Sequence, residues 1–387
     1  MFVSSIKLKN WRNFPNAEAQ LGPVTYVIGP NASGKSNFLD ALRFLRDVAK
    51  PEGGGLQQAI KLRGGLSKIR CLHARHDPEV RIDVEWSTGT KSDPEIWTYS
   101  LGLTAEKRGA KRPIVSHERV THKAGGKVSN LGRRPDEKDH ADPELLTQTW
   151  LEQNSANKDF RSIADELASV TYLHLVPQLL KFGGEIAGKE VEGDPFGQAF
   201  LSRIAKTRES TRRVRLDRIK SALRNAAPQF VDLDFQRDDI GHPHLVALYS
   251  HHRPKAGWQR EDQLSDGTLR MIALFWLLLE NKGLLLLEEP ELSLDEDVVR
   301  ALPPLIDKLG QSGRRQSQIV ITTHSYALLD NPGIDGRWVV RVEAAHEGST
   351  LAMPNAEELR MMNEDGFPPA QVLLSKVHPA EAAEMAL

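Results

Sequence analysis

The residues whose types and spacing most clearly imply chemistry lie at 29–36, which read Gly-Pro-Asn-Ala-Ser-Gly-Lys-Ser. Such a glycine-rich loop between a strand and a helix directs backbone N–H groups, a lysine and a metal-binding hydroxyl at phosphates. The segments on either side predict the strand and the helix that such a loop joins. Residues 24–28 are rich in β-branched and apolar residues, and residues 37–45 have apolar residues at helical spacing. The pattern predicts a nucleoside triphosphate site in which Lys35 contacts the β- and γ-phosphates and Ser36 binds Mg²⁺. The other residues assigned to the nucleotide here are Gly29, Asn31, Ser33, Gly34 and Asn37.

A second group suited to chemistry is the run Leu-Leu-Leu-Leu-Glu-Glu-Pro-Glu at 284–291, an apolar strand that ends in carboxylates. Enzymes with a phosphate loop need acidic side chains there to manage the metal ion and the attacking water. The spacing predicts that Glu288 holds Mg²⁺, directly or through water, and that Glu289 orients and deprotonates the water. The alternative is a solvated acidic turn, and the phosphate loop upstream favours the chemical interpretation.

Two further patterns flank this acidic strand. The segment 263–270 reads Gln-Leu-Ser-Asp-Gly-Thr-Leu-Arg, in which Ser265 and Asp266 can cap a helix whose N-terminus is suited to an anion. A buried strand predicted from residue 318 ends in His324. A histidine at a strand end is more often a packed or capping residue than a catalytic one. Its place after the acidic strand nevertheless predicts a sensor of the γ-phosphate.

In this order the motifs resemble an ABC-type ATPase head of the SMC/RecF/OLD group, as in AAA family ATPases of bacterial repair and phage-defence systems. The resemblance covers about 1–105 and 245–345. It implies an α/β P-loop NTPase fold that uses ATP and Mg²⁺ and hydrolyses ATP to ADP and phosphate. It also implies a homodimer that sandwiches ATP between the phosphate loop of one copy and the signature motif of the other.

The resemblance assigns roles residue by residue. Glu289 matches the catalytic glutamate and His324 the switch histidine. Two positions depart from the family pattern: Asp266 stands where transporters carry glycine, and Glu288 replaces the usual aspartate and lengthens the Mg²⁺ arm by one methylene. The remaining nucleotide contacts that the resemblance implies are Arg12 in the opening strand and turn, Ser265 and Gly267 in the signature motif, and Asp295 in the D-loop. The candidates for the Q-loop glutamine are Gln57 and Gln58.

The expected organisation has three parts. Residues 1–140 form the N-terminal part of the head, with the phosphate loop, a β-meander over 80–103 and basic loops around a short strand at 114–120. Residues 141–228 form a helical insertion. Residues 229–387 form the C-terminal part, with the signature motif, the acidic strand, the D-loop, the switch histidine and a short tail.

Composition and length exclude several classes of protein. Among 387 residues there is one cysteine, Cys71, so no internal disulfide or cysteine-built zinc site is possible, which fits a cytoplasmic location. No signal-peptide core is visible, and the longest apolar stretch, 271–279, is far short of the roughly 20 residues that span a membrane. The interval 37–264 shows no sustained heptads, so an SMC-type coiled coil is not expected. The segment 336–387 lacks the acidic pattern of a Toprim nuclease domain.

The net charge is −1, so any nucleic-acid contact must come from a local patch. A basic helix predicted over 199–225 offers one, and the residues assigned to nucleic acid are Arg208, Arg212, Arg213 and Arg215. A solvated helix or a partner-docking face explains the same charges equally well. No aromatic residues interleave with the arginines, so stacking on single-stranded bases is not expected.

The leading hypothesis is therefore an ATPase acting as sensor or regulator in a DNA-directed repair or phage-defence system, with a separate effector protein such as a nuclease. The alternative is a nucleotide-gated clamp that controls a protein partner without touching DNA. A transporter ATPase is a third option, disfavoured by the helical insertion and by the lack of a clear Q-loop.

Overall fold

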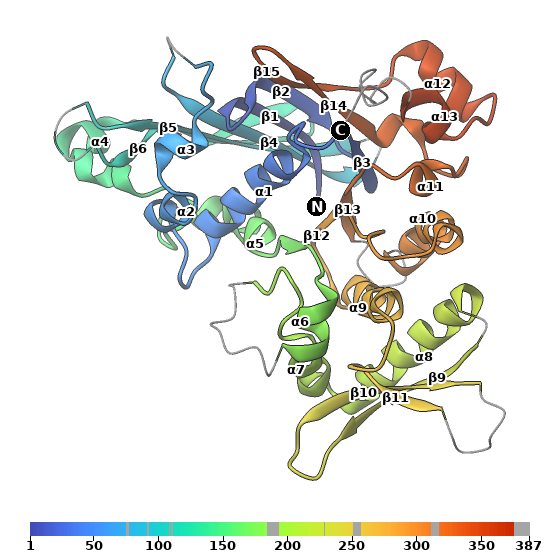
Figure 1. The fold of residues 1–387 in the computed structure, drawn as a ribbon. Helices are drawn as coiled ribbons and strands as arrows, with labels where there is room; N and C mark the ends of the chain where they lie inside the picture. The colour runs from blue at the N-terminus through green and yellow to red at the C-terminus, as the bar shows by residue number, and fades with distance from the viewer. Residues whose placement is uncertain are drawn as a thin grey trace, which may run out of the picture. The chain divides into compact units, whose positions relative to one another are not determined.

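The computed structural model describes residues 1–74, 77–90, 93–107, 109, 111–183, 193–227, 229–250, 257–310 and 317–374. The chain divides into two compact units (Figure 1). The first contains Met1–Val170, Asp335–Phe367 and the described residues from Gln371. The second contains Thr171–Ile334 and Pro368–Ala370. In the described ranges, no helix is both long and apolar enough to cross a membrane.

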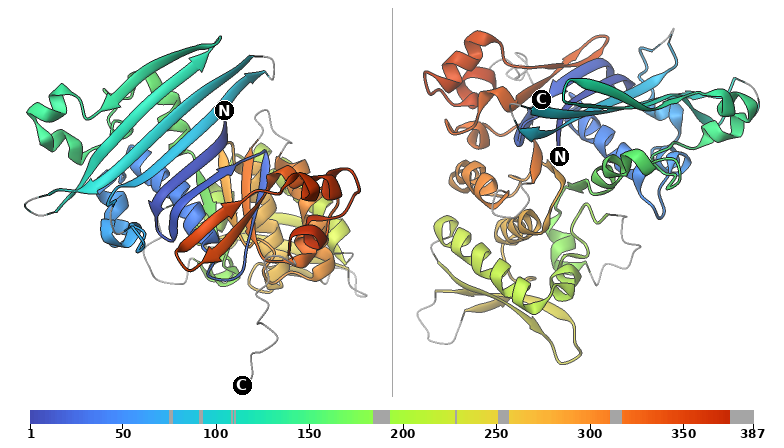
Figure 2. Two further views of the ribbon diagram at one scale, coloured as in Figure 1. Left: turned by 90° about the horizontal axis from the view of Figure 1, so that it is seen from above. Right: turned by 180° about the vertical axis from the view of Figure 1, so that it is seen from behind.

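The first unit contains a six-stranded antiparallel sheet in the order β2-β1-β4-β5-β6-β7, and Figure 2 shows its long strands side by side. The strands are β1 (Phe2–Trp11), β2 (Phe14–Gln20), β4 (Val80–Thr90), β5 (Asp93–Ala105), β6 (Pro113–Ala124) and β7 (Lys127–Arg134). In β4, apolar and polar side chains alternate, and this alternation determines which face of the strand is buried. The side chains of Val80, Ile82, Val84 and Trp86 are buried, whereas the residues between them are partly exposed. The β-meander expected at 80–103 is confirmed by the pairing of β4 with β5.

The prediction of long basic loops between 106 and 140 is wrong. The strand expected at 114–120 extends over the whole of β6, and β7 follows it after a turn at Gly125 and Gly126. Outward residues such as Arg119 and Lys123 are charged, and the register shifts between Val120 and Thr121, so the sequence lacks a simple alternating pattern.

The first unit also holds the strand that leads into the phosphate loop. β3 (Val24–Ile28) runs parallel to β14 (Val339–Ala345), which forms an antiparallel hairpin with β15 (Gly348–Ala352). The helices of this unit are α1 (Lys35–Ala49), α2 (Leu56–Leu62), α3 (Leu66–Ile69), α4 (Glu137–Ala141), α5 (Arg161–Ala168) and α12 (Ala356–Asn363), with short 3-10 helices at Pro143–Thr147, Lys158–Phe160 and Gly336–Trp338. Helix α1 packs against β1 and α5, and buries Phe38, Leu42 and Leu45.

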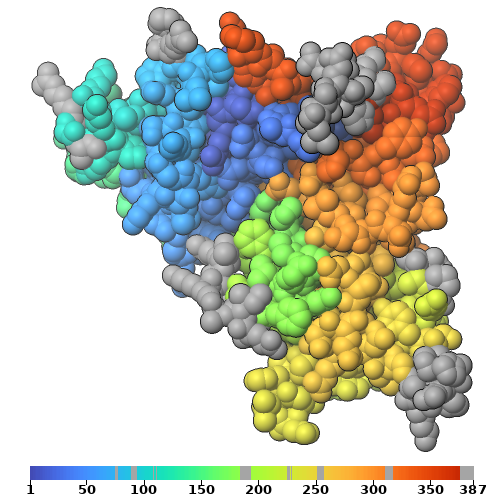
Figure 3. Space-filling model, in the orientation of Figure 1, coloured from blue at the N-terminus to red at the C-terminus, as the bar shows by residue number. Residues whose placement is uncertain are grey.

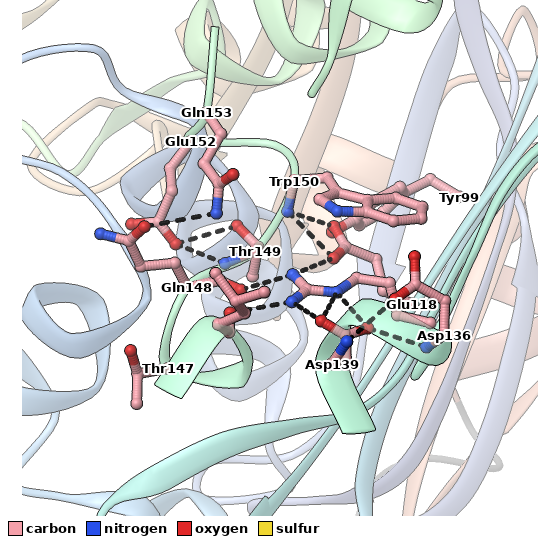
Figure 4. Close-up of polar contacts among 12 residues, drawn as sticks. Tyr99, Glu118, Asp136, Asp139, Thr147, Gln148, Thr149, Trp150, Glu152 and Gln153 are labelled. Carbon is pink, nitrogen blue, oxygen red and sulfur yellow. Dashed lines mark hydrogen bonds and ion pairs between the residues drawn. The ribbon is translucent and has the colours of Figure 1, made fainter. Parts of the chain in front are cut away.

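A polar network centred on the buried residues Tyr99, Glu118, Arg134 and Asp139 ties the outer strands of the large sheet to the chain that follows them (Figure 4). Glu118 on β6 accepts hydrogen bonds from the Tyr99 hydroxyl at 2.8 Å and from the Trp150 N–H at 2.9 Å. Arg134 on β7 binds Asp139 on α4 and donates to the carbonyls of residues 145 and 148, each at 2.8 Å. Burial raises the pKa of Glu118 to about 7, although the hydrogen bonds from Trp150 and Tyr99 and the charge of Arg134 oppose the shift.

The second unit contains three parallel strands in the order β13-β12-β8, which are β13 (Gln318–Thr323), β12 (Leu284–Glu288) and β8 (Thr171–Leu173). A small antiparallel sheet in the order β11-β10-β9 contains β9 (Phe230–Arg237), β10 (Pro243–Tyr249) and β11 (Trp258–Arg260), and its residues contribute to the yellow part of the surface in Figure 3. The helices are α6 (Pro177–Phe182), α7 (Phe200–Lys206), α8 (Glu209–Ala226), α9 (Asp266–Glu280), α10 (Glu296–Gly310) and α11 (Tyr326–Leu329); α13 (Pro369–Leu373) spans the boundary of the two units.

The helical predictions for this unit hold in part. The apolar helix expected at 269–279 is α9, which is buried on nearly every side. The basic helix expected at 199–225 is instead two helices, because Thr207 closes α7 and Arg208 is extended. β8 lies within the segment expected to be helical and pairs with the acidic strand β12. Three residues are too few to give a strand signal in the sequence.

Candidate active site

The phosphate loop joins β3 to α1, and close contacts explain its glycines. A Cβ atom on Gly29 would lie 2.6 Å from Ser33 Oγ and 2.8 Å from the Val342 carbonyl oxygen. Gly34 has a φ of 114° at the start of α1, and a Cβ there would collide with the Asn13 amide. Only glycine allows this conformation and this approach. The two glycines therefore allow the loop backbone to lie close to Ser33, Val342 and Asn13.

The loop presents donors that suit a phosphate group. Lys35 is 7% exposed, and its Nζ donates to the carbonyl oxygens of Gly29 at 2.8 Å and Pro30 at 3.1 Å. The Ser33 hydroxyl is buried and has no hydrogen-bond partner among the described residues. A buried hydroxyl of this kind needs an acceptor, and phosphate oxygens supply one. The donor set thus fits a nucleotide phosphate.

Residues outside the motif, which the sequence did not indicate, support the backbone of this loop through hydrogen bonds. Asn13 donates to the Ser33 carbonyl oxygen and to Ser349 Oγ, both at 2.8 Å, and accepts from the Asn37 amide at 2.8 Å. Ser349, in β15, donates to the same Ser33 carbonyl at 2.7 Å. These contacts join positions far apart in the chain, so no local spacing reveals them. Asn37, predicted to touch the nucleotide, is part of this support.

Arg12, another predicted nucleotide contact, binds a carboxylate in the structure. Its Nη2 lies 2.7 Å from Asp40 Oδ2 on α1, and Arg63 lies 2.9 Å from the other oxygen. Burial tends to raise the pKa of Asp40, but the two arginines outweigh this effect and leave that pKa below its usual value. The geometry gives Arg12 a role in anchoring α1, and its contact with nucleotide stays a prediction.

In the second unit the structure brings together the two residues expected to handle water and γ-phosphate. β12 and β13 are parallel neighbours, so the residues after both strands lie at the same edge. Glu289 Oε1 lies 3.0 Å from His324 Nδ1. Glu289 has a φ of 44°, a left-handed conformation that costs a non-glycine residue about 1–3 kcal/mol and is typical of functional sites.

The carboxylates of Glu288 and Glu291, on either side of Glu289 in the sequence, each accept a hydrogen bond from a hydroxyl group. The Tyr172 hydroxyl on β8 donates to Glu288 Oε2. Glu291 is 7% exposed and accepts a hydrogen bond from Thr323, the residue before the switch histidine. Burial raises the pKa of the Glu291 carboxyl. Tyr172 and Glu291 were not singled out from the sequence. Tyr172 lies in the three-residue strand, and Glu291 read only as part of an acidic turn.

The signature segment begins α9 as expected. Ser265 Oγ accepts from the Thr268 N–H at 3.1 Å, and the Lys181 Nζ on α6 lies 2.7 Å from Asp266. A Cβ on Gly267 would lie 2.7 Å from the Ser293 carbonyl oxygen, so the signature and D-loop segments pack together in this unit. Asp295 is exposed just before α10.

The four arginines assigned to nucleic acid differ in exposure and in contacts. Arg208 and Arg213 are exposed. Arg212 lies over the Phe235 ring at 4.3 Å, and Arg215 pairs with Glu280 at 3.4 Å and lies over Trp276. A pocket beside α8 contains both cations and aromatic rings; its lining residues include Arg212, Arg213, Lys220, Phe235, Trp258, Glu209, Asp217, Asp232 and Asp234. The carboxylates outnumber the cations there, which disfavours a phosphate chain.

Comparison with known proteins agrees with these motifs. A family described as "AAA domain, putative AbiEii toxin, Type IV TA system" matches residues 24–330. The "DNA replication and repair protein RecF" of Lachnoclostridium phytofermentans is 33% identical over 85 residues, which are 22% of this chain and 24% of that protein. RecF of Roseiflexus castenholzii is 32% identical over 92 residues, covering 22% of this chain and 23% of that protein. The matches thus span about a quarter of the length of these curated relatives.

The fold has a counterpart among solved structures. The SMC head solved in complex with the C-terminal winged-helix domain of ScpA aligns with a TM-score of 0.54 and 12% identity, over 92% of this chain and 99% of that one. At this identity the likeness concerns the fold alone, and the expected α/β P-loop fold is confirmed. The fold is that of an SMC head, a stretch of the chain is similar to RecF, and the chain belongs to the AAA-domain family that matches residues 24–330.

Proposed function

We propose that this chain binds ATP with Mg²⁺, hydrolyses it to ADP and phosphate, and dimerises around the nucleotide. The observation that carries the proposal is Glu289 at the end of an apolar strand: its backbone is left-handed, and its carboxylate lies 3.0 Å from His324. A carboxylate in this setting is suited to orient water and accept its proton. The phosphate loop, with Lys35 and the buried Ser33 hydroxyl, supplies the matching anion site.

In the proposed reaction each side chain has one task. Lys35 and the loop N–H groups bind the phosphates, and Ser36 and Glu288 hold the metal ion. Bound Mg²⁺ neutralises charge on the phosphate oxygens. Glu289 accepts a proton from water as the water oxygen bonds to the γ-phosphorus and the bond to ADP breaks. His324 holds the Glu289 carboxylate.

Dimerisation is supported by the N-terminus of α9. Ser265 and Gly267 lie in its first turn, where backbone N–H groups and the helix dipole favour an anion. One chain carries both a phosphate loop and a signature segment, so a two-fold dimer with two equivalent nucleotide sites is the simplest assembly. ATP would then act as the link between the copies.

Mixing two inactive variants tests the shared site. Lys35→Ala removes the phosphate contact, and Ser265→Arg blocks the signature helix. Each variant alone should lack ATPase activity. Mixed heterodimers contain one intact site, so activity should return to a fraction of the wild-type rate. A Ser265→Arg protein with wild-type turnover, or a mixture that stays inactive although both variants are folded, would contradict a site shared between copies.

For the biological role, we propose a sensor or regulatory subunit of a DNA-directed repair or phage-defence system, with a separate effector such as a nuclease. The RecF relatives, named for DNA replication and repair, support this role. Arg208→Glu with Arg213→Glu tests direct DNA contact, because both side chains are exposed. Arg337→Glu, a surface arginine paired with Asp335, is the control. Salt-dependent DNA affinity that only the first pair of changes abolishes supports the role.

The second candidate is a nucleotide-gated clamp for a protein partner. It is favoured by the internal contacts of Arg212 and Arg215, which interrupt the basic helix as a phosphate-binding surface. The SMC head that shares this fold was solved with a protein domain bound. No DNA affinity at low salt, together with ATP-dependent dimerisation, would favour the clamp over the DNA-directed role.

A further inference from the structure

Tyr172 belongs to none of the nucleotide-binding motifs, yet it contacts the residue proposed to hold the metal ion. It is the central residue of β8, which runs parallel to β12, and it lies opposite Leu286 in the register. Side chains two positions apart on a strand point to the same face. Glu288 follows Leu286 by two positions, so Tyr172 and Glu288 share a face, and the Tyr172 hydroxyl donates to Glu288 Oε2.

The contact matters because Glu288 stands where the family pattern has aspartate. A glutamate carries one more methylene and therefore one more rotatable bond, which makes its carboxylate harder to hold in one orientation. Tyr172 is 7% exposed and sits on a strand, so its ring is a rigid support for the donor. A fixed donor of this kind restricts the added freedom of the longer side chain.

The chemistry of the donor also suits a metal ligand. An ionised carboxylate offers about four lone-pair sites, so a hydrogen bond from one hydroxyl is compatible with metal coordination by the same group. Partners that orient a metal ligand commonly change metal affinity by about 10–100-fold when they are removed. Tyr172 is neutral and adds no charge to the site, so its effect is on orientation.

We propose that Tyr172 is a positioning residue that orients the Glu288 carboxylate toward the divalent cation bound with ATP. The inference rests on the proposed function, because it takes Glu288 as a metal ligand. It also gives the short strand β8 a purpose: it places one hydroxyl beside the acidic strand end. The longer Glu288 side chain, oriented by Tyr172, takes the place of the metal-binding aspartate of the family pattern.

The test is Tyr172→Phe, which removes only the hydroxyl. Mn²⁺ binding to the ATP-bound protein, followed by electron paramagnetic resonance, should weaken by about 10-fold. The Mg²⁺ concentration for half-maximal ATPase activity should rise by a similar factor. ATP affinity measured without divalent cation should stay unchanged, because the proposed effect of Tyr172 acts through the Glu288 carboxylate and the metal ion that it holds.

Tyr99→Phe is the matched control. It also removes a tyrosine hydroxyl that donates to a glutamate, here Glu118 in the first unit, at 2.8 Å. Its Mn²⁺ affinity should equal that of the wild type, even where its unfolding temperature falls. A loss of Mn²⁺ affinity common to both variants would attribute the effect to destabilisation and overturn the proposal.

A double-mutant cycle with Glu288→Asp completes the test. The shorter aspartate withdraws from Tyr172, so Tyr172→Phe should change Mn²⁺ affinity less than about 2-fold in that background, against about 10-fold in the wild type. Equal effects in both backgrounds would overturn the proposal.

Glu288→Gln separates this inference from the proposed function. If Glu288→Gln weakens Mn²⁺ binding and Tyr172→Phe does not, the positioning role alone falls. If Glu288→Gln leaves Mn²⁺ binding unchanged, the proposed metal ligand is wrong and the positioning role falls with it.

Discussion

Two glutamates, one on a strand of the first unit and one directly after a strand of the second, show how environment separates a structural carboxylate from one suited to chemistry. Glu118 in β6 is fully buried, accepts hydrogen bonds from Tyr99 and Trp150, and lies 3.7 Å from Arg134. Glu289 follows β12, is partly exposed, has a left-handed backbone and contacts His324. The first has a complete set of fixed partners. The second combines a strained backbone, solvent access and a contact with a histidine, as expected of a residue that acts on a substrate.

The largest effect we expect comes from breaking the buried network. Glu118→Ala leaves the Tyr99 hydroxyl and the Trp150 N–H without an acceptor, while Arg134 keeps its contact with Asp139. Each buried donor left without an acceptor costs about 1–3 kcal/mol, so the two together cost about 2–6 kcal/mol. Denaturant unfolding should show a loss of that order, whereas Glu118→Gln, which keeps an acceptor of the same shape, should lose much less. Equal stability of the alanine variant and the wild type would contradict the structural role of the network.

The next effect contrasts two buried cations, Arg134 and Lys35. Arg134 binds the Asp139 carboxylate, and the Lys35 Nζ donates to the carbonyl oxygens of Gly29 and Pro30 in the loop that is proposed to bind phosphate. Lys35→Ala should weaken ATP binding by about 100-fold or more, because charge-assisted hydrogen bonds to phosphate are lost. Fluorescence titration with an ATP analogue measures this change. Unchanged ATP affinity in a variant that unfolds like the wild type would contradict the assignment of ATP binding to the phosphate loop.

A smaller effect should appear in the pH dependence of stability that Glu118 causes. The folded-state pKa of Glu118 is about 7 against an ordinary value of 4.5, so between these values the folded state binds more protons than the unfolded state. The Glu118 contribution to stability is therefore full below pH 4.5 and is lost as pH rises through 7. Glu118→Gln should flatten this decline in denaturant unfolding measured from pH 4.5 to 8. An identical decline in the variant would assign the pH dependence to other groups.

The smallest effect on stability should come from Glu289→Gly. Glycine relieves a left-handed strain of about 1–2 kcal/mol and adds up to about 1 kcal/mol of freedom to the unfolded chain. The two terms nearly cancel, so the free energy of unfolding should not fall, although hydrolysis should be lost. Calorimetric and denaturant unfolding of the variant check this expectation. A fall above about 1 kcal/mol would show that the Glu289 side chain is structural, as in Glu118.

The features that could be predicted from the sequence are those that depend on neighbouring residues in the chain. The phosphate loop at 29–36, the acidic strand end at Glu288 and the apolar helix α9 are contiguous patterns whose period or spacing carries the information. The sequence order also indicated that Glu289 and His324 belong together, because both follow buried parallel strands.

Long-range contacts account for what could not be predicted. Asn13 meets Ser349 across nearly the whole chain, and Tyr172 meets Glu288 through a three-residue strand. The basic helix looked like a surface for phosphates because nothing in its own sequence shows that Arg215 pairs with Glu280 on α9. Charge alone does not say whether a side chain faces solvent.

The most direct test of the central claim is Glu289→Gln, which keeps the size of the side chain and removes the proton acceptor. ATP hydrolysis should fall by about 10²–10⁴-fold, while ATP affinity stays within a few-fold of the wild type. With ATP and Mg²⁺ the variant should accumulate as a dimer in analytical ultracentrifugation, since the nucleotide that links the copies is not consumed. A Glu289→Gln protein that hydrolyses ATP at the wild-type rate would contradict the account.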